Sequence, residues 1–237
     1  MDSLERGVIK NKSGVGVLDK AVAVLSLLAE EGPLPLAGVV EATGLPRPTA
    51  HRILAALEAH HLVVRDRRGY SLGLRLYGWG NRAAGARLVD AARPVLAALR
   101  DETGESTQLY VREGEHRICV ASVERSVGLR DTVPVGAVLP LERGSAGKVL
   151  LAYSEEGELR LGAAEAREIR ERGWAESVAE REAGVASVSA PVFGGGGALR
   201  AAVCASGPIF RLGESPGKRL AGPTVAAARE LGRALGG

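Results

Sequence analysis

The segment of residues 36–70 constrains the fold most, because helix and turn signals alternate there at short intervals. Residues 36–42 predict a short helix, and Gly44 after it can adopt the left-handed conformation that ends a helix. Pro46 and Pro48 follow, and proline is tolerated in the first turn of a new helix. Apolar residues then recur at helical spacing, so this second helix has one buried face: Ala50, Ile53, Leu54 and Leu57.

Strand signals follow the second helix. Residues 62–65 predict a strand, residues 66–69 a turn and residues 70–72 a returning strand. A further helix precedes the pair, because apolar residues recur at helical spacing over residues 18–28 and Gly32 then stops the pattern. The order helix, helix, turn, helix, hairpin is that of a winged helix-turn-helix, which predicts a DNA-binding domain.

Positive charge gathers in the same segment. Between Gly44 and Arg75, six arginines stand against two acidic residues, a net charge of +4. Local positive charge is typical of phosphate contacts, although an ordinary solvated surface also carries arginines. We expect the start of the second helix to enter the major groove and the hairpin turn to contact phosphate or the minor groove. The predicted DNA contacts are Arg47, Pro48, Thr49, His51, Arg52, Arg65, Arg67 and Arg68.

The rest of the chain has a different pattern, in which helices flank strands linked as hairpins. This arrangement predicts an α+β sensor domain. The expected helices span residues 74–86, 88–103, 163–172 and 218–235, a loop feeds a helix over residues 144–153, and the expected strands span residues 107–112, 117–124, 185–193 and 199–206.

Composition excludes several classes of protein. Hydrophobic residues make up 46% of the chain, so disorder is not expected overall. No apolar run approaches the roughly 20 residues of a membrane span. The first residues are polar, without a signal-peptide core. The two cysteines, Cys119 and Cys204, imply no disulfide framework. We therefore expect a cytoplasmic protein that does not contact a membrane.

Signatures of enzymes and metal sites are incomplete. Glu142 replaces the first glycine that a phosphate-binding P-loop requires, and Val149 replaces its serine or threonine. Residues 144–147 lack the spacing of a hydrolase elbow. His60 and His61 are better explained as the end of a helix than as metal ligands. We expect no enzymatic activity, no cofactor and no metal site.

Several motifs in the same order resemble the IclR family of bacterial regulators, over nearly the whole chain from about Ser13 onward. One departure is Lys20, where the family often has arginine. The stretches that carry the resemblance are SGVGVLDKAVAVLSLLAEEG, LAGVVEATGLPRPTAHRILAALEAHHLVVRD, YSLGLRLYGWG, VPVGAVLPLERGSAGKVLLAY, EREAGVASVSAPVF and AAVCASGP. A further stretch, TGESTQLYVREGEHRICVASVERSVGLRDTVPVG, resembles the NdgR/AreB-type members, which are associated with amino-acid metabolism, notably leucine biosynthesis.

The resemblance implies a domain order and an assembly. We expect a flexible arm over residues 1–12, a winged helix-turn-helix domain over 13–73, a linker helix over 74–87 and an effector-binding and oligomerisation domain over 88–237. The last domain would be GAF-like, with an antiparallel sheet flanked by helices. Homodimers, in some members paired into tetramers, would bind palindromic operators in double-stranded DNA.

The resemblance also implies a pocket for a small organic acid or an amino-acid-related effector. Backbone N–H groups at the start of the helix near residue 144 can hold a carboxylate. The serines among the candidates also fit purely local hydrogen bonding, and Arg130 and Asp131 are charged residues whose position the sequence does not settle. The predicted effector-binding residues are Leu139, Leu141, Gly144, Ser145, Ala146, Val185, Ser187, Cys204 and Ser206.

Two functions follow from these features. The first is a ligand-responsive DNA-binding transcription regulator, a repressor or a dual regulator, of amino-acid metabolism genes. The second is a small-molecule binding or interaction protein whose winged helix contacts protein rather than DNA. Salt dependence separates them, because phosphate contacts make affinity fall steeply as salt rises. The effector, the operator, the sign of regulation and the choice between dimer and tetramer are not readable from the sequence.

Overall fold

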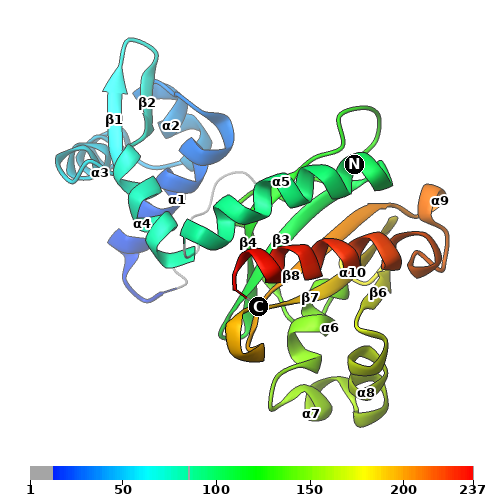
Figure 1. Ribbon diagram of the computed structural model, residues 1–237. Helices are drawn as coiled ribbons and strands as arrows, with labels where there is room; N and C mark the ends of the chain where they lie inside the picture. Colours follow the sequence, from blue (N-terminus) through cyan, green and yellow to red (C-terminus); the bar gives the residue numbers. More distant parts are fainter. Residues whose placement is uncertain (1–12, 85, 237) are drawn as a thin grey trace. The chain divides into compact units, whose positions relative to one another are not determined.

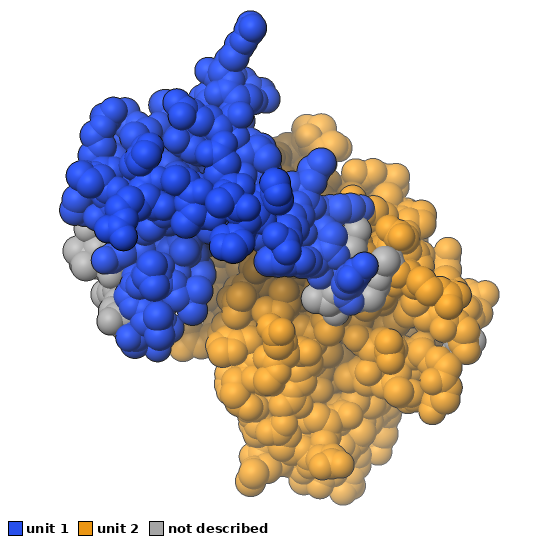
Figure 2. All heavy atoms as spheres, turned by 90° about the vertical axis from the view of Figure 1, so that its left-hand side faces the viewer, with its two compact units in different colours: residues 1–83 blue, residues 84–237 orange. Residues whose placement is uncertain are grey.

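The computed structural model describes residues 13–84 and 86–236. The flexible arm expected over residues 1–12 lies outside the described residues. The chain divides into two compact units, residues 1–83 and residues 84–237 (Figure 2). This division falls within the segment where the sequence predicts a linker helix.

The first unit has the predicted winged helix-turn-helix order (Figure 1). Gly44 has φ 66° and ψ 9°, the left-handed conformation expected at the turn between the second and third helices. The helix over residues 47–59 buries the four apolar residues predicted to form its inner face: Ala50, Ile53, Leu54 and Leu57. The elements are α1 (Gly16–Glu31), α2 (Leu36–Thr43), α3 (Arg47–Ala59), β1 (Val63–Asp66), β2 (Gly69–Leu72) and α4 (Leu74–Ala84).

The hairpin of β1 and β2 is fixed to the loop before α2. Leu34 and Tyr70 exchange two backbone hydrogen bonds, with N···O distances of 3.0 and 2.8 Å. A Cβ on Gly69 would lie 2.2 Å from the carbonyl oxygen of Leu34, and Gly69 itself has φ 130°. Only glycine allows this close approach of two backbones, so the position of the wing is set by backbone packing rather than by its arginines.

The second unit is built on a six-stranded antiparallel sheet in the order β5-β4-β3-β8-β7-β6. Helices α5 and α10 pack against one face of this sheet, and α6 and α8 pack against the other (Figure 1). The predicted fold class, a winged helix-turn-helix followed by an antiparallel sheet flanked by helices, is confirmed. The strands are β3 (Ser106–Glu113), β4 (His116–Val123), β5 (Val138–Pro140), β6 (Ala175–Val178), β7 (Val185–Phe193) and β8 (Leu199–Pro208). The helices are α5 (Ala86–Thr103), α6 (Ser145–Ala152), α7 (Gly157–Leu161), α8 (Ala163–Arg172), α9 (Ile209–Leu212) and α10 (Gly217–Ala234), with a 3-10 turn η1 (Gly195–Gly197).

Strand alternation sorts side chains between the two faces. Along β8, Val203 belongs to the core beneath α5 and α10, whereas Cys204 belongs to the core beneath α6. Along β7, Val188 lies in the first core, and its neighbours Ser187 and Ser189 point to the opposite face because successive side chains alternate. The face beneath α6 therefore receives the polar side chains of both strands.

Four elements had no counterpart in the sequence analysis: β5, β6, α7 and α9. Each has only three to five residues, too few for a period to be recognised. The glycine-rich segment between β7 and β8 joins these two antiparallel strands as a hairpin, and it contains the 3-10 turn, in which Gly196 has φ 79°. The expected connecting helix ends at Ala84, and α5 begins at Ala86.

Candidate DNA-binding surface and effector pocket

The N-terminal half of α3 presents the predicted base-contacting side chains. Arg47, Pro48, His51 and Arg52 are exposed, and Thr49 is half-buried. The helix starts cleanly because the carbonyl oxygen of Pro46 accepts hydrogen bonds from the N–H groups of Thr49 and Ala50, at 2.8 and 3.0 Å. The opposite side of α3 lies in the core of this unit, which holds the exposed side rigidly outward.

The wing carries three more of the predicted contacts. Arg67 and Arg68 form the two-residue turn between β1 and β2, and both are exposed. Asp66 caps the turn by accepting a 2.8 Å hydrogen bond from the N–H of Arg68, and this bond together with the Arg68 guanidinium lowers the pKa of Asp66. The guanidinium of Arg65 lies 5.3 Å from the centre of the Tyr70 ring. The turn is thus ordered while two of its cations face water.

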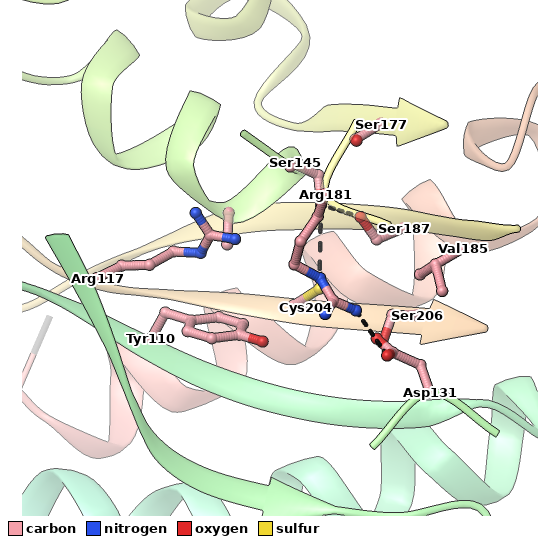
Figure 3. Close-up of a pocket in the computed structure, with 12 residues that line it drawn as sticks. Tyr110, Arg117, Asp131, Ser145, Ser177, Arg181, Val185, Ser187, Cys204 and Ser206 are labelled. Carbon is pink, nitrogen blue, oxygen red and sulfur yellow. Dashed lines mark hydrogen bonds and ion pairs between the residues drawn. The ribbon is translucent and has the colours of Figure 1, made fainter. Parts of the chain in front are cut away.

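Seven of the nine predicted effector residues line one pocket beneath the start of α6 (Figure 3). Its volume is about 20 Å³, enough for a water molecule, so a larger ligand requires the lining side chains to move apart. The predicted lining residues are Gly144, Ser145, Ala146, Val185, Ser187, Cys204 and Ser206, and the pocket also includes Tyr110, Arg117, Asp131, Ser177 and Arg181.

Leu139 and Leu141 do not line this pocket. Leu141 is fully buried in the core beneath α6, and Leu139 packs against the same core from β5. The carbonyl of Leu141 lies so close to α6 that a Cβ on Gly147 would be 1.9 Å from its oxygen. The side chain of Leu141 packs in the core with α6, so the prediction that Leu139 and Leu141 line the effector pocket does not fit the pocket described here.

Hydroxyl groups form a ladder across the floor of the pocket. The Oγ of Ser145 lies 2.8 Å from the Oγ of Ser187 and 2.8 Å from that of Ser189. Strand register explains the arrangement, because Ser187 pairs with Ser206 and Ser189 pairs with Cys204 on the neighbouring strand. Each hydroxyl can donate or accept a hydrogen bond, so these serines can bind either an acceptor or a donor group of a ligand.

The start of α6 borders the ladder. The N–H of Gly144 donates to the carboxylate of Glu180 at 3.1 Å, and Glu180 also pairs with Lys148 at 2.5 Å. The N–H groups of Ser145 and Ala146 have no acceptor among the residues that the structure describes. Free N–H groups at a helix start favour an anion.

Two arginines reach the same pocket, and sequence reasoning missed both. Arg181 is paired with Asp131 at 2.6 Å, and the side chain of Asp131 is only 5% exposed. Arg117 is 2% exposed and has no carboxylate within 4 Å in the described part of the chain. Its guanidinium donates to the carbonyl of Pro140 and lies 5.3 Å from the centre of the Tyr110 ring. Burial lowers the pKa of Arg117.

A sequence signal for Arg117 existed. Arg117 stands two residues before Cys119 on the same strand, so the two side chains share a face, and Cys119 lies between the apolar residues Ile118 and Val120. An arginine on that face points inward. Arg130, the other charged candidate, pairs with Glu124 at 2.6 Å and does not line the pocket.

Two families of known domains match the two units. Residues 17–67 match the IclR helix-turn-helix domain, and residues 82–164 and 163–233 match the C-terminal domain of the bacterial transcriptional regulator IclR. The chain belongs to the IclR family. It is therefore a DNA-binding transcription regulator, and members of this family are regulators rather than enzymes. Within the described residues, no helix is both long and apolar enough to cross a membrane.

Relatives in this family span nearly the full chain. The uncharacterized HTH-type transcriptional regulator RhmR of Escherichia coli (strain K12) is 30% identical, over 94% of this chain and 95% of the relative. The glycerol operon regulatory protein of Streptomyces griseus is 33% identical, over 82% and 85%. The crystal structure of the Thermotoga maritima IclR has the same fold, with a TM-score of 0.73 at 24% identity, over 94% of this chain and 99% of that one.

Proposed function

We propose that this IclR-family protein is a ligand-controlled regulator that reads its operator with α3 and the wing. The proposal rests on the amphipathic character of α3. Its apolar face is buried, and Arg47 and Arg52 on the other face are exposed. A mobility shift with the promoter of its own or a neighbouring gene tests it. A specific shift that weakens steeply with salt is expected, and the lack of any specific shift on genomic fragments would overturn it.

The first unit also supports assembly into homodimers. Large apolar side chains are exposed on the outer side of α1 and on α4. Such side chains favour contact with another protein surface, and a two-fold dimer would match a palindromic operator. Sedimentation at several concentrations distinguishes dimers from tetramers. The exposed residues are Val17, Leu18, Val22, Leu74, Tyr77 and Trp79.

The pocket beneath α6 is the proposed effector site. Free N–H groups at a helix start, a hydroxyl ladder and buried arginines suit a small organic acid or an amino-acid-related compound. Control of DNA binding requires that the ligand bind the DNA-competent and DNA-incompetent forms with different affinity. A ligand that binds tightly without changing operator affinity is therefore not the effector.

The target genes are proposed to belong to amino-acid metabolism, with repression or dual control as the mode. This proposal is supported by the resemblance of residues 103–136 to the NdgR/AreB-type members. Genomic footprinting of bound sites tests it, because bound promoters identify the regulated genes. Sites confined to unrelated operons would overturn the assignment.

A protein-contacting winged helix is the second candidate function. The apolar side chains exposed on α4, such as Tyr77 at 65% exposure, give it some support. A flat salt dependence of complex formation would favour this candidate over DNA binding.

A further inference from the structure

The pocket beneath α6 holds an imbalance of buried charge. Three of the residues that line it are ionised side chains: Arg117, Arg181 and Asp131. Asp131 neutralises Arg181 through the 2.6 Å ion pair. Nothing of opposite charge in the described part of the chain lies within 4 Å of Arg117. One positive charge is therefore in excess among the residues that line the site.

The surroundings of Arg117 increase this imbalance. A Cβ placed on Gly144 would lie 3.2 Å from Nη2 of Arg117, so the guanidinium is beside the residue that directly precedes α6. The start of a helix carries partial positive charge, and the free N–H groups of Ser145 and Ala146 lie there. The Nε of Arg117 is also buried without a hydrogen-bond partner. The buried Arg117 guanidinium, whose Nε has no partner, thus lies beside the free N–H groups at the start of α6.

Burying an unpaired charge is costly, and proteins normally avoid it by pairing. The carbonyl of Pro140 and the ring of Tyr110 contact the Arg117 guanidinium, but neither carries a negative charge. Nε2 of Gln108 is also buried without a partner, but Gln108 does not line the pocket. The pocket is therefore complementary to a ligand that supplies one negative charge and a hydrogen-bond acceptor.

We propose that Arg117 is the specificity-determining residue of this pocket, and that it selects a small monocarboxylate without an adjacent ammonium group over neutral and zwitterionic ligands. The inference rests on the proposed role of the pocket as the effector site. An α-amino acid would bring a second cation within a few ångströms of Arg117, next to a pair in which Asp131 is already occupied. A 2-oxo or 2-hydroxy acid would instead place an oxygen against the serine ladder.

Three probes of similar size separate these possibilities: acetate, acetamide and glycine. They are added at equal concentration to the full-length protein, with ionic strength matched by the sodium salt of a bulky sulfonate buffer, and the thermal unfolding midpoint is recorded. Acetate is expected to raise the midpoint in a saturable manner, while acetamide and glycine leave it nearly unchanged. An equal response to glycine, or no response to acetate, would overturn the proposal.

Variants assign the response to the residue. Arg117→Met is expected to weaken acetate binding by roughly 10- to 100-fold, and its midpoint without acetate should equal or exceed that of the wild type because the buried charge is gone. Arg117→Lys keeps the charge and retains part of the response, which guards against a folding defect in the first variant. Arg130→Met is the matched control, because Arg130 is exposed, pairs with Glu124 and lies outside the pocket. A full acetate response in Arg117→Met would overturn the assignment.

A mobility shift on the same preparation separates this inference from the proposed function. If the wild-type protein binds no promoter fragment, the proposed function fails whatever acetate does. If it binds a fragment but its acetate response does not depend on Arg117, only the present inference fails.

Discussion

The two units of this protein use arginine in opposite ways. In the first unit, Arg47, Arg52 and Arg67 are exposed and have no carboxylate within 4 Å among the described residues. In the second unit, Arg117 is buried and Arg181 is mostly covered. A hydrated arginine needs no partner in the free protein and can exchange its counterions for phosphate. A buried arginine needs a partner at all times, so its neighbours indicate what the site binds.

Exposed and buried arginines indicate different kinds of function. Exposed charge is informative only when it is patterned, as on one side of α3 and around the turn of the wing. Buried charge is informative one residue at a time, because each ion without a partner is costly. Removing one charge from each unit should therefore have unequal consequences.

The largest expected effect comes from Asp131→Asn. This change leaves Arg181 without its buried partner, and we expect the second unit to lose about 3 kcal/mol of unfolding free energy. Urea denaturation followed by Trp174 fluorescence, in a Trp79→Phe background, measures this unit alone. The matched control is Asp66→Asn, which removes an exposed pair with Arg68. Followed by Trp79 fluorescence in a Trp174→Phe background, it should leave the unfolding midpoint of the first unit unchanged. Similar midpoints for Asp131→Asn and its parent would mean that water screens the pocket pair.

Substitution on α3 should have the next largest effect, on binding rather than on stability. Arg47→Ala and Arg52→Ala should each weaken specific operator binding by roughly 1–3 kcal/mol if these side chains read bases, with unchanged unfolding midpoints. Fluorescence anisotropy with operator and random duplexes measures the specific and the non-specific affinity. Equal losses on random DNA would show that the two arginines contact only phosphate.

The DNA-binding unit could be predicted from sequence almost completely. Its signals are local: Gly44 adopts the turn conformation expected of it, and the apolar residues of α3 are buried as their spacing predicts. A local signal of this kind depends on periodicity and turn chemistry, and both are present in a single short segment. The role of the arginines at the operator stays a prediction.

The pocket could be predicted only in part, because it is assembled from distant segments. Ser187 and Ser206 come together through the register of β7 with β8, and the family resemblance pointed to both. Arg181 carries no local motif, and for Arg117 the one signal is its alternation with Cys119. The position of both side chains depends on how β4 and the loop after β6 pack beneath α6. Leu141 was placed wrongly because an apolar residue near a pocket fits both a wall and a core, and only packing decides between them.

The buried thiols, both in the second unit, should have a smaller effect, on the pH dependence of the unfolding free energy. Burial raises the pKa of Cys119 to about 12 from its ordinary value of 9.0. The folded state then holds its thiol proton more tightly than the unfolded state, so the stabilisation is complete below pH 9 and is lost as pH rises from about 9 toward 12. The loss due to Cys119 between pH 8 and pH 10 is about 1 kcal/mol. Urea denaturation across this range should show a shallower decline in Cys119→Ala, and an identical decline would refute the assignment.

The smallest effect is expected at the wing, where Arg67 is exposed. Arg67→Ala should leave stability unchanged and weaken binding to operator and random DNA to the same extent, because the turn positions the protein on the backbone without reading bases. The slope of log affinity against log salt should fall by about 0.9 for the one phosphate contact removed. Gly69→Ala is the comparison variant that changes the position of the wing rather than its charge. Its Cβ would meet the carbonyl of Leu34 and displace the whole hairpin. If Arg67→Ala instead changed preference among operator sequences, the wing would be reading bases or groove shape, and exposed arginines in this unit would not form a single class.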